Sequence, residues 1–477
     1  MKGILRFTQN DNTIMYNDYE PVIGLEIHVE LKTKSKMFCG CFADWFGKKP
    51  NSNTCPVCLG LPGALPVPNR IAVEWCVMLG LALNCEIPQF SKFDRKNYFY
   101  PDLAKGYQIS QYDQPFAVNG NLTLDSGNQD IKRDQNSRNL IKTIRIRRVH
   151  LEEDTGKLLH DVVDGKRVSL IDFNRGGVPL VEIVTEPDIR SSEEARVFLK
   201  KLYQIIRYIG ISDADMEKGS MRLEPNISVR LKTDKDLPNY KVEVKNINSF
   251  NFAKKAIDFE IVRHIDLLSQ GETPKQETRG WDEKKGITYS QRSKEEAHDY
   301  RYFPEPDIPP IRWTKEQIAK IKEQIPELPD QKIIRFMKKY QLNDYDSTIL
   351  IETQERAEYF EKTVKTTLDS GDQHIKMDQI STKTIANWII NKKADIKKVS
   401  PEELLKLIAG QTQKVTIPDE ELEKIIQKIL AENPRAVADY KSGKENVLMY
   451  LLGQVMREIK GQGKAEKIKE VLQNLIN

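Results

Sequence analysis

Cysteine, long apolar runs and net charge are all scarce in this 477-residue chain. Six cysteines are too few for a disulfide framework at this size, so they favour a reducing, cytoplasmic compartment, with clustered cysteines as metal ligands. No stretch of 18 apolar residues occurs, and the first twenty residues lack the apolar core of a signal peptide, so the sequence predicts no membrane segment. A formal charge of +4 excludes nucleic-acid binding through overall charge alone, and any such contact must be local.

The sequence also contains no G-x4-G-K-[ST] phosphate-binding loop, so an ATP site would have to be of another kind. What it does contain is the composition of a folded protein, with 39% apolar and 30% charged residues. A chain of this length exceeds a single hydrophobic core, so we expect two to four domains.

The segment from Val22 to Leu31 alternates strictly between apolar and polar residues. Its odd positions are aliphatic, whereas its even positions include Glu26, His28 and Glu30. This period of two predicts a strand with one face in a core. The polar face has two interpretations: it is simply solvated, or its carboxylates and imidazole share a divalent cation with acidic residues from later strands.

The first 310 residues mix strands and helices in an order that predicts an α+β fold with an antiparallel sheet. Helical spacing occurs in three segments, at 69–84, 191–210 and 252–270, where Ser191 and Glu194 predict a capping box. Strand patterns occur at 143–151, 178–184, 226–231 and 240–245. Cys76 and Cys85 lie in or just after the first of these helices and are expected to be core thiols.

A proline-dense segment at 303–310 predicts a linker, and everything after it has helical periodicity. A lysine-rich break near 392–398 suggests a second boundary. We therefore expect an N-terminal extension at 1–18, a cradle domain with the catalytic and zinc sites at 19–310, an all-α helical domain at 311–395 and a helical tail domain at 396–477.

Four cysteines are arranged as a C-x-C pair and a C-x2-C pair thirteen residues apart: Cys39, Cys41, Cys55 and Cys58. Two closely spaced pairs of thiolates suit tetrahedral Zn²⁺, and four protein ligands would make the site structural rather than catalytic. The alternative is a compact loop with four reduced thiols.

Acidic residues recur in two of the later strand patterns. Glu152, Glu153 and Asp154 are consecutive, and such a cluster is repulsive unless cations relieve it. Glu182 stands inside an apolar strand, V-P-L-V-E-I-V, where a bare carboxylate would be costly to bury. These residues are therefore candidates to join the opening strand around a divalent cation.

Two basic segments leave alternatives open. Lys96 precedes the aromatic run Tyr98-Phe99-Tyr100, where a lysine could hold a phosphate, gate a polar passage or lie on the surface beside packed rings. Arg175 in N-R-G-G offers a planar guanidinium to a phosphate or carboxylate beside two glycines, but an ordinary turn is an equally good interpretation.

Several long motifs together resemble one family, the B subunits of bacterial aspartyl/glutamyl-tRNA(Asn/Gln) amidotransferases. The resemblance is close over about residues 20–310 and looser beyond. The motifs are V-I-G-L-E-I-H-V-E-L, P-N-S-N-T, F-D-R-K-N-Y-F-Y-P-D, D-F-N-R-G-G-V-P-L-V-E-I-V-T-E-P-D, V-K-N-I-N-S-F, Q-E-T-R and D-Y-R-Y-F-P-E-P-D.

This resemblance implies an ATP-dependent ligase that phosphorylates the side-chain carboxylate of Asp-tRNA(Asn) or Glu-tRNA(Gln) and lets ammonia displace the phosphate. It places magnesium ligands at Glu26, His28, Glu153 and Glu182, and gives Glu30 no role, so Glu30 is expected to face water. Lys96 and Tyr98 match the lining where the ammonia passage meets this site, and Arg175 joins them as a catalytic candidate. Mg²⁺ would bridge ATP phosphates, and Zn²⁺ would be structural.

The sequence has no amidase-type Gly/Ser-rich stretch and no cysteine in a nucleophile-like setting, so ammonia must come from elsewhere. The resemblance implies a heterotrimer with an amidase A subunit and a small C subunit, and a tail that binds tRNA. The alternative function is a zinc-stabilised tRNA-binding protein that has lost the chemistry. The chain departs from the family at Leu223-Glu224, where Cys-Asp is usual, and this departure could alter a local turn.

Overall fold

A computed structural model describes residues 18–124, 142–293, 299–369, 380–413, 419–444, 446–459 and 465–476. The expected N-terminal extension lies outside these residues, except for Asp18. The described chain divides into two compact units, residues 1–331 and 332–477. The four predicted domain ranges stay predictions, and each unit is described below by itself.

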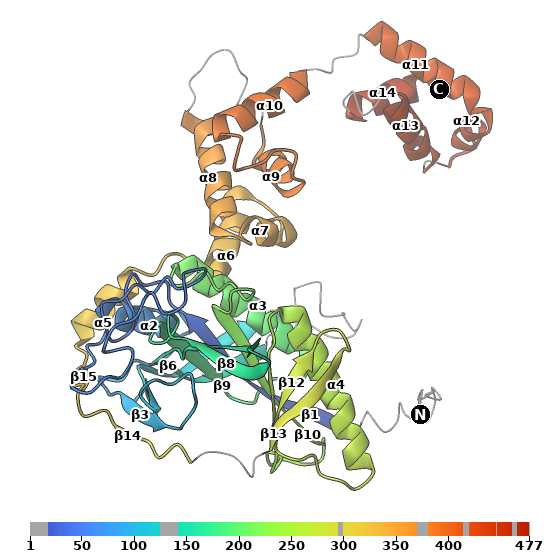
Figure 1. The fold of residues 1–477 in the computed structure, drawn as a ribbon. Helices are drawn as coiled ribbons and strands as arrows, with labels where there is room; N and C mark the ends of the chain where they lie inside the picture. The colour runs from blue at the N-terminus through green and yellow to red at the C-terminus, as the bar shows by residue number, and fades with distance from the viewer. Residues whose placement is uncertain are drawn as a thin grey trace. The chain divides into compact units, whose positions relative to one another are not determined.

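The first unit is built on an eight-stranded sheet (Figure 1). Its spatial order is β13-β12-β11-β10-β1-β9-β6-β5. Every neighbouring pair is antiparallel except β11 and β12, which are parallel, so the predicted α+β fold is confirmed with this one parallel pair. The strands are β1 (Tyr19–Glu30), β5 (Ala117–Leu124), β6 (Lys142–Glu153), β9 (Pro179–Thr185), β10 (Met221–Leu231), β11 (Val242–Lys245), β12 (Glu277–Asp282) and β13 (Ile287–Ser293).

The opening strand, β1, lies inside this sheet, between β10 and β9. Its aliphatic residues are buried as predicted, with Ile23, Ile27 and Val29 at 0% exposure. Strand alternation places Glu26, His28 and Glu30 together on the opposite face. The register sets His28 opposite Glu182 on one side and Arg222 on the other.

Three helices bury the apolar face of the sheet: α2 (Arg70–Ala82), α3 (Ser192–Ile209) and α4 (Phe250–Ser269). Ser191 accepts a hydrogen bond from the backbone of Glu194, so the predicted cap exists. The Glu194 carboxylate accepts from the backbone of Arg190 rather than of Ser191, so the reciprocal half of the capping box is shifted by one residue. The thiols of Cys76 and Cys85 are buried in this core as expected.

Smaller sheets complete the first unit. One joins β14, β3 and β4, another joins β15 and β2, and a hairpin is formed by β7 and β8. Phe303–Pro304 forms β14 and pairs with β3, so the proline-dense segment is part of this unit rather than a free strap. These strands are β2 (Phe90–Ser91), β3 (Asp94–Asn97), β4 (Tyr107–Ser110), β7 (Lys157–Val163), β8 (Lys166–Asp172), β14 (Phe303–Pro304) and β15 (Ile311–Arg312). Helix α5 (Lys315–Glu323) follows them, and its Ile321 packs in the core of the first unit.

The second unit is entirely helical in its described residues. One apolar cluster is formed by α6–α10, and another by α11–α14. No helix in the described ranges is long and apolar enough to cross a membrane. The helices are α6 (Pro329–Tyr340), α7 (Asp344–Leu350), α8 (Gln354–Asp369), α9 (Thr382–Ile390), α10 (Pro401–Gln413), α11 (Asp419–Glu432), α12 (Pro434–Lys441), α13 (Val447–Glu458) and α14 (Ala465–Ile476).

Candidate active site

Five adjacent strands, β6, β9, β1, β10 and β11, place acidic and imidazole side chains close together in the first unit. They provide two groups of side chains, each close enough to share one metal ion. We call His28, Glu152 and Glu182 the first group, and Glu26, Glu224 and Glu243 the second group. Because Glu26 and His28 are alternate residues of β1, the two groups are neighbours on one face of the sheet, about 7 Å apart.

In the first group, Glu182 lies between two histidines. Its Oε2 is 3.4 Å from Nε2 of His28 and 3.2 Å from Nε2 of His150, which lies directly opposite it on β6. Glu152 is 3.7 Å from each of the same two imidazoles and accepts a hydrogen bond from Ser110. Two carboxylates and two imidazoles therefore alternate around one centre.

The electrostatics of this first group are those of a buried carboxylate pair. Burial alone would lower the pKa of His28, but the carboxylates of Glu182, Glu224 and Glu152 raise this pKa to about 9. Burial likewise opposes the charge on Glu182, but the two histidines hold its pKa well below the usual value. The Nδ1 atoms of His28 and His150 are buried without a hydrogen-bond partner among the described residues. The same carboxylates also raise the pKa of His150, so both imidazoles are shifted toward the protonated form.

In the second group, three carboxylates face two lysines, Lys245 and Lys241, of which Lys241 lies 3.9 Å from Glu26. Lys245 lies 2.9 Å from Glu224 and 3.4 Å from Glu243, and burial together with Glu182 and Glu243 raises the pKa of Glu26. Asn226 donates to Glu26 over 3.0 Å, while its own amide oxygen is buried and has no partner in the described chain. Oxygen ligands of this kind are those that Mg²⁺ and Mn²⁺ prefer.

The structure brings the predicted Lys96 to the edge of the first group. Its pKa is raised because the nearby carboxylates of Glu152 and Glu182, together with tyrosine rings, outweigh the effect of burial. Its ammonium lies 4.8 Å from the ring centre of Tyr300 and 5.9 Å from that of Tyr98. The cation of Lys96 thus lies near the rings of Tyr98 and Tyr300 and beside the carboxylates.

Glu153 is not brought into either group. Its carboxylate accepts from the backbone of Ile109 at 3.0 Å and pairs with Lys105 at 2.5 Å. Since neighbouring residues of a strand point to opposite faces, Glu152 and His150 share the face of Glu182, and Glu153 does not.

Arg175 directs its guanidinium mainly at backbone. It donates to the carbonyl oxygens of Thr155 and Gly156 at 2.9 and 2.8 Å, and lies 3.8 Å from Asp154. These contacts hold the turn that follows β6. The catalytic role expected for Arg175 stays a prediction.

Glu30 does not face water, contrary to expectation. It is 7% exposed and accepts a hydrogen bond of 3.0 Å from the indole of Trp45. Burial, with the nearby carboxyl of Asp154, raises the pKa of Glu30 to about 8. The cause is tertiary, since the loop that carries the cysteines folds back and covers the end of β1.

The four cysteines of that loop come together as the spacing predicted, with sulfur atoms within 4.8 Å of one another. A hydrogen bond from Cys39 lowers the pKa of Cys58 to about 4, and the fully buried Lys36, whose Nζ is 3.7 Å from the Cys58 sulfur, helps to stabilise the thiolate. This geometry is compatible with a tetrahedral zinc site.

Two family models match the chain. The model described as "GatB/GatE catalytic domain" matches residues 21–319, which include every residue of both groups, and the model described as "GatB domain" matches residues 373–476. The chain belongs to the GatB family.

Curated GatB proteins resemble the chain over nearly its whole length. Relatives from Carboxydothermus hydrogenoformans, Thermotoga maritima and Thermosipho melanesiensis are 44, 45 and 47% identical over 499, 504 and 493 residues. Each alignment covers 96% of this chain and 98–99% of the relative. All three relatives are named as the B subunit of an aspartyl/glutamyl-tRNA(Asn/Gln) amidotransferase.

Four residues of this candidate site are absent from the predicted ligand set: His150, Glu152, Glu224 and Glu243. Strand alternation from His150 would have selected Glu152 over Glu153, so that signal was present in the sequence. Glu224 belongs to the departure at Leu223-Glu224, which lies inside β10 and not in a turn. Glutamate there keeps the carboxylate and lengthens it by one methylene.

Proposed function

We propose that this chain is the catalytic B subunit of an ATP-dependent aspartyl/glutamyl-tRNA amidotransferase. In this proposal it phosphorylates the side-chain carboxylate of Asp-tRNA(Asn) or Glu-tRNA(Gln), and ammonia then displaces phosphate to give the amide. The observation that carries the proposal is the pair of acidic groups on one sheet face, in which five carboxylates and an imidazole from five adjacent strands form two sets, each close enough to share one metal ion. A protein that only bound tRNA would have no use for so costly an arrangement.

The residues fit divalent cations. The imidazole nitrogen and carboxylates of the two groups and the unpartnered amide oxygen of Asn226 are suitable ligands, and the raised pKa of Glu26 reflects burial together with repulsion from Glu182 and Glu243. Bound there, Mg²⁺ would neutralise the phosphates of ATP and stabilise charge on the transferred phosphoryl group. We assign His28, Glu152 and Glu182 to one ion and Glu26, Glu224 and Glu243 to the other.

The chain's own residues then have distinct tasks. His150 contacts both Glu182 and Glu152 and holds them in place. Lys96 presents a fixed positive charge beside the carboxylates, suited to an acyl phosphate. Tyr98 and Tyr300 confine that ammonium between their rings, at the position expected for arriving ammonia.

Other parts of the proposal rest on the family and the fold together. Structural Zn²⁺ occupies the cysteine loop, an amidase A subunit supplies ammonia, a small C subunit completes a cytoplasmic heterotrimer, and the helical second unit contributes to tRNA binding. The partners' names come from the resemblance, and the naming of the relatives as one subunit of an enzyme supports a complex of several chains.

The test is Glu182→Ala in a complex co-expressed with the A and C subunits. The variant should assemble and hydrolyse glutamine, yet amidate mischarged tRNA about 10³-fold more slowly, because one cation loses a ligand. Glu186→Ala, on the same segment but paired with Arg147, is the control and should amidate normally. Normal amidation by Glu182→Ala would refute the assignment.

A further inference from the structure

The Q-E-T-R segment, which the proposed chemistry does not use, lies at the start of the edge-side strand β12. This strand is the one with a parallel neighbour, β11, and the register places Thr278 opposite Glu243. Successive residues of β12 point to opposite faces, so Thr278 and Arg279 lie on different sides of the sheet.

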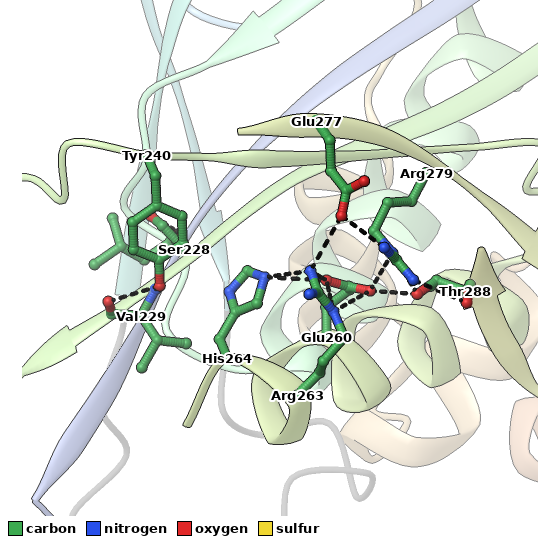
Figure 2. Close-up of polar contacts among 10 residues, drawn as sticks. Ser228, Val229, Tyr240, Glu260, Arg263, His264, Glu277, Arg279 and Thr288 are labelled. Carbon is green, nitrogen blue, oxygen red and sulfur yellow. Dashed lines mark hydrogen bonds and ion pairs between the residues drawn. The ribbon is translucent and has the colours of Figure 1, made fainter. Parts of the chain in front are cut away.

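On the helical side, Arg279 enters a buried network around Glu260 of α4 (Figure 2). Glu260 is 0% exposed, and its carboxylate lies 3.1 Å from Arg279, 2.6 Å from Arg263 and 3.0 Å from His264. The hydroxyl of Thr288 on β13 also donates to it. The helix and two strands therefore meet at one carboxylate.

This network, which we call the α4 brace, is balanced in charge. Arg279 also pairs with Glu277 at 2.6 Å and donates to the backbone of Thr288 at 3.1 Å (Figure 2). Two arginines thus face two glutamates, and several bonds fix each strand. The brace fixes the position of β12 along β11. Because it contains several bonds, loss of one bond leaves the others in place.

On the other side, Thr278 reaches the second group. Its hydroxyl donates to Oε2 of Glu243 over 2.9 Å, while Lys245 lies 3.4 Å from Oε1 of the same carboxylate. Glu243 is therefore held from two sides. Without the hydroxyl, the carboxylate would be free to turn toward Lys245 and away from Glu26 and Glu224.

We infer that Thr278 is a positioning residue that sets the orientation of Glu243 for a divalent cation, and that the α4 brace fixes the strand from which it acts. The second group is a suitable ligand set on independent grounds, because the 9%-exposed Asn226 contacts Glu26 while its amide oxygen meets no partner among the described residues. The inference rests on the proposed function.

The experiment measures amidation by the assembled complex as a function of Mg²⁺ concentration. Thr278→Val keeps the side-chain volume but removes the donor, and should raise the half-saturating Mg²⁺ concentration about tenfold while the maximal rate recovers at high Mg²⁺. Thr278→Ser restores a hydroxyl and should return the value to within about twofold of wild type. Mn²⁺ binding, followed by electron paramagnetic resonance, should show the same order without turnover.

Two controls separate positioning from general loosening. Thr288→Val removes two hydrogen bonds of the brace, its donation to Glu260 and its acceptance from Arg279, and should lower thermal stability. The ion pairs of Arg279 remain, so Mg²⁺ dependence should change little, and Thr123→Val on β5 should change neither property. Unaltered Mg²⁺ dependence in Thr278→Val, or an equal shift in Thr288→Val, would overturn the inference. If Thr278→Val does not fold, the smaller Thr278→Ala replaces it with the same expectation. A wild-type complex without Mg²⁺-dependent amidation would instead refute the proposed function.

Discussion

The first unit contains two clusters in which glutamate contacts histidine, namely the first group and the α4 brace. The two clusters differ in how their charge is balanced. In the first group, Glu152 and Glu182 face two imidazoles, and further carboxylates lie close by. In the α4 brace, Glu260 faces two arginines that remain charged at any ordinary pH.

The pKa values of the histidines in the two clusters reflect this difference. The pKa of His28 is raised to about 9 by surrounding carboxylates despite burial, whereas burial lowers the pKa of His264, which Arg263 and Arg279 also disfavour in its charged form. A group that must recruit a proton for neutrality can instead recruit a metal ion. The α4 brace already contains its cations, Arg263 and Arg279, and is therefore structural, although it can position a site nearby.

The largest expected contrast is between removal of Glu260 and removal of the charge of Glu182. Glu260→Ala removes the fully buried carboxylate that Arg263 and Arg279 share and should cost about 3–5 kcal/mol of unfolding free energy. Glu182→Gln removes a carboxylate whose pKa the two histidines hold low, so it should lower the melting temperature, but by less than Glu260→Ala because the histidines can release their protons, while amidation is abolished. Calorimetry and amidation assays of both variants check this, and an equal loss of stability in the two variants would contradict the expected difference.

The cysteine loop extends the contrast to the proposed structural zinc site. Cys55→Ser removes one of four thiolates, so the purified protein should lose one equivalent of zinc and about 2–5 kcal/mol of stability in the first unit. Amidation per folded molecule should persist at moderate temperature. Metal analysis with thermal melting tests this, and an unchanged zinc content would show that these cysteines do not bind the zinc.

The next largest expected difference between the first group and the α4 brace is in their response to pH. Because protonated imidazole cannot bind a metal, a pKa of about 9 for His28 predicts cation affinity that rises about tenfold per pH unit up to pH 9 and then levels off. Glu260 has a pKa lowered to about 2, so its contribution to stability is complete above its usual value of 4.5 and is lost as pH falls toward 2. Mn²⁺ titrations from pH 6 to 9 measure the first effect; flat affinity would exclude His28 as a ligand.

The smallest expected effect concerns the link between the cysteine loop and β1. Trp45→Phe keeps an aromatic ring but removes the hydrogen bond to Glu30, which should cost about 1 kcal/mol and raise the pKa of Glu30 further from about 8. Thermal melting at several pH values tests this. Equal stability of wild type and variant would mean that the bond makes no net contribution.

Periodicity in the sequence was enough for the main elements. The alternation of residues 22–31 predicted β1 and its buried face, and the spacing of the cysteines predicted their cluster. The isolated Glu182 predicted a partnered carboxylate, and two histidines partner it. These features are local, because strand alternation and ligand spacing are set by backbone geometry within a few residues.

Tertiary structure alone decided which side chains meet across strands. Register between β6 and β9 brings His150 to Glu182 and leaves Glu153 with Lys105, and the fold of the cysteine loop buries Glu30 under Trp45. The parallel pairing of β11 with β12, which sets Thr278 against Glu243, depends on a helix between them and on the brace that this helix carries. The sequence by itself determined which residues could carry charge on the polar face; pairing between distant segments determined which charges remain for a ligand, because register is fixed by packing and not by any one strand.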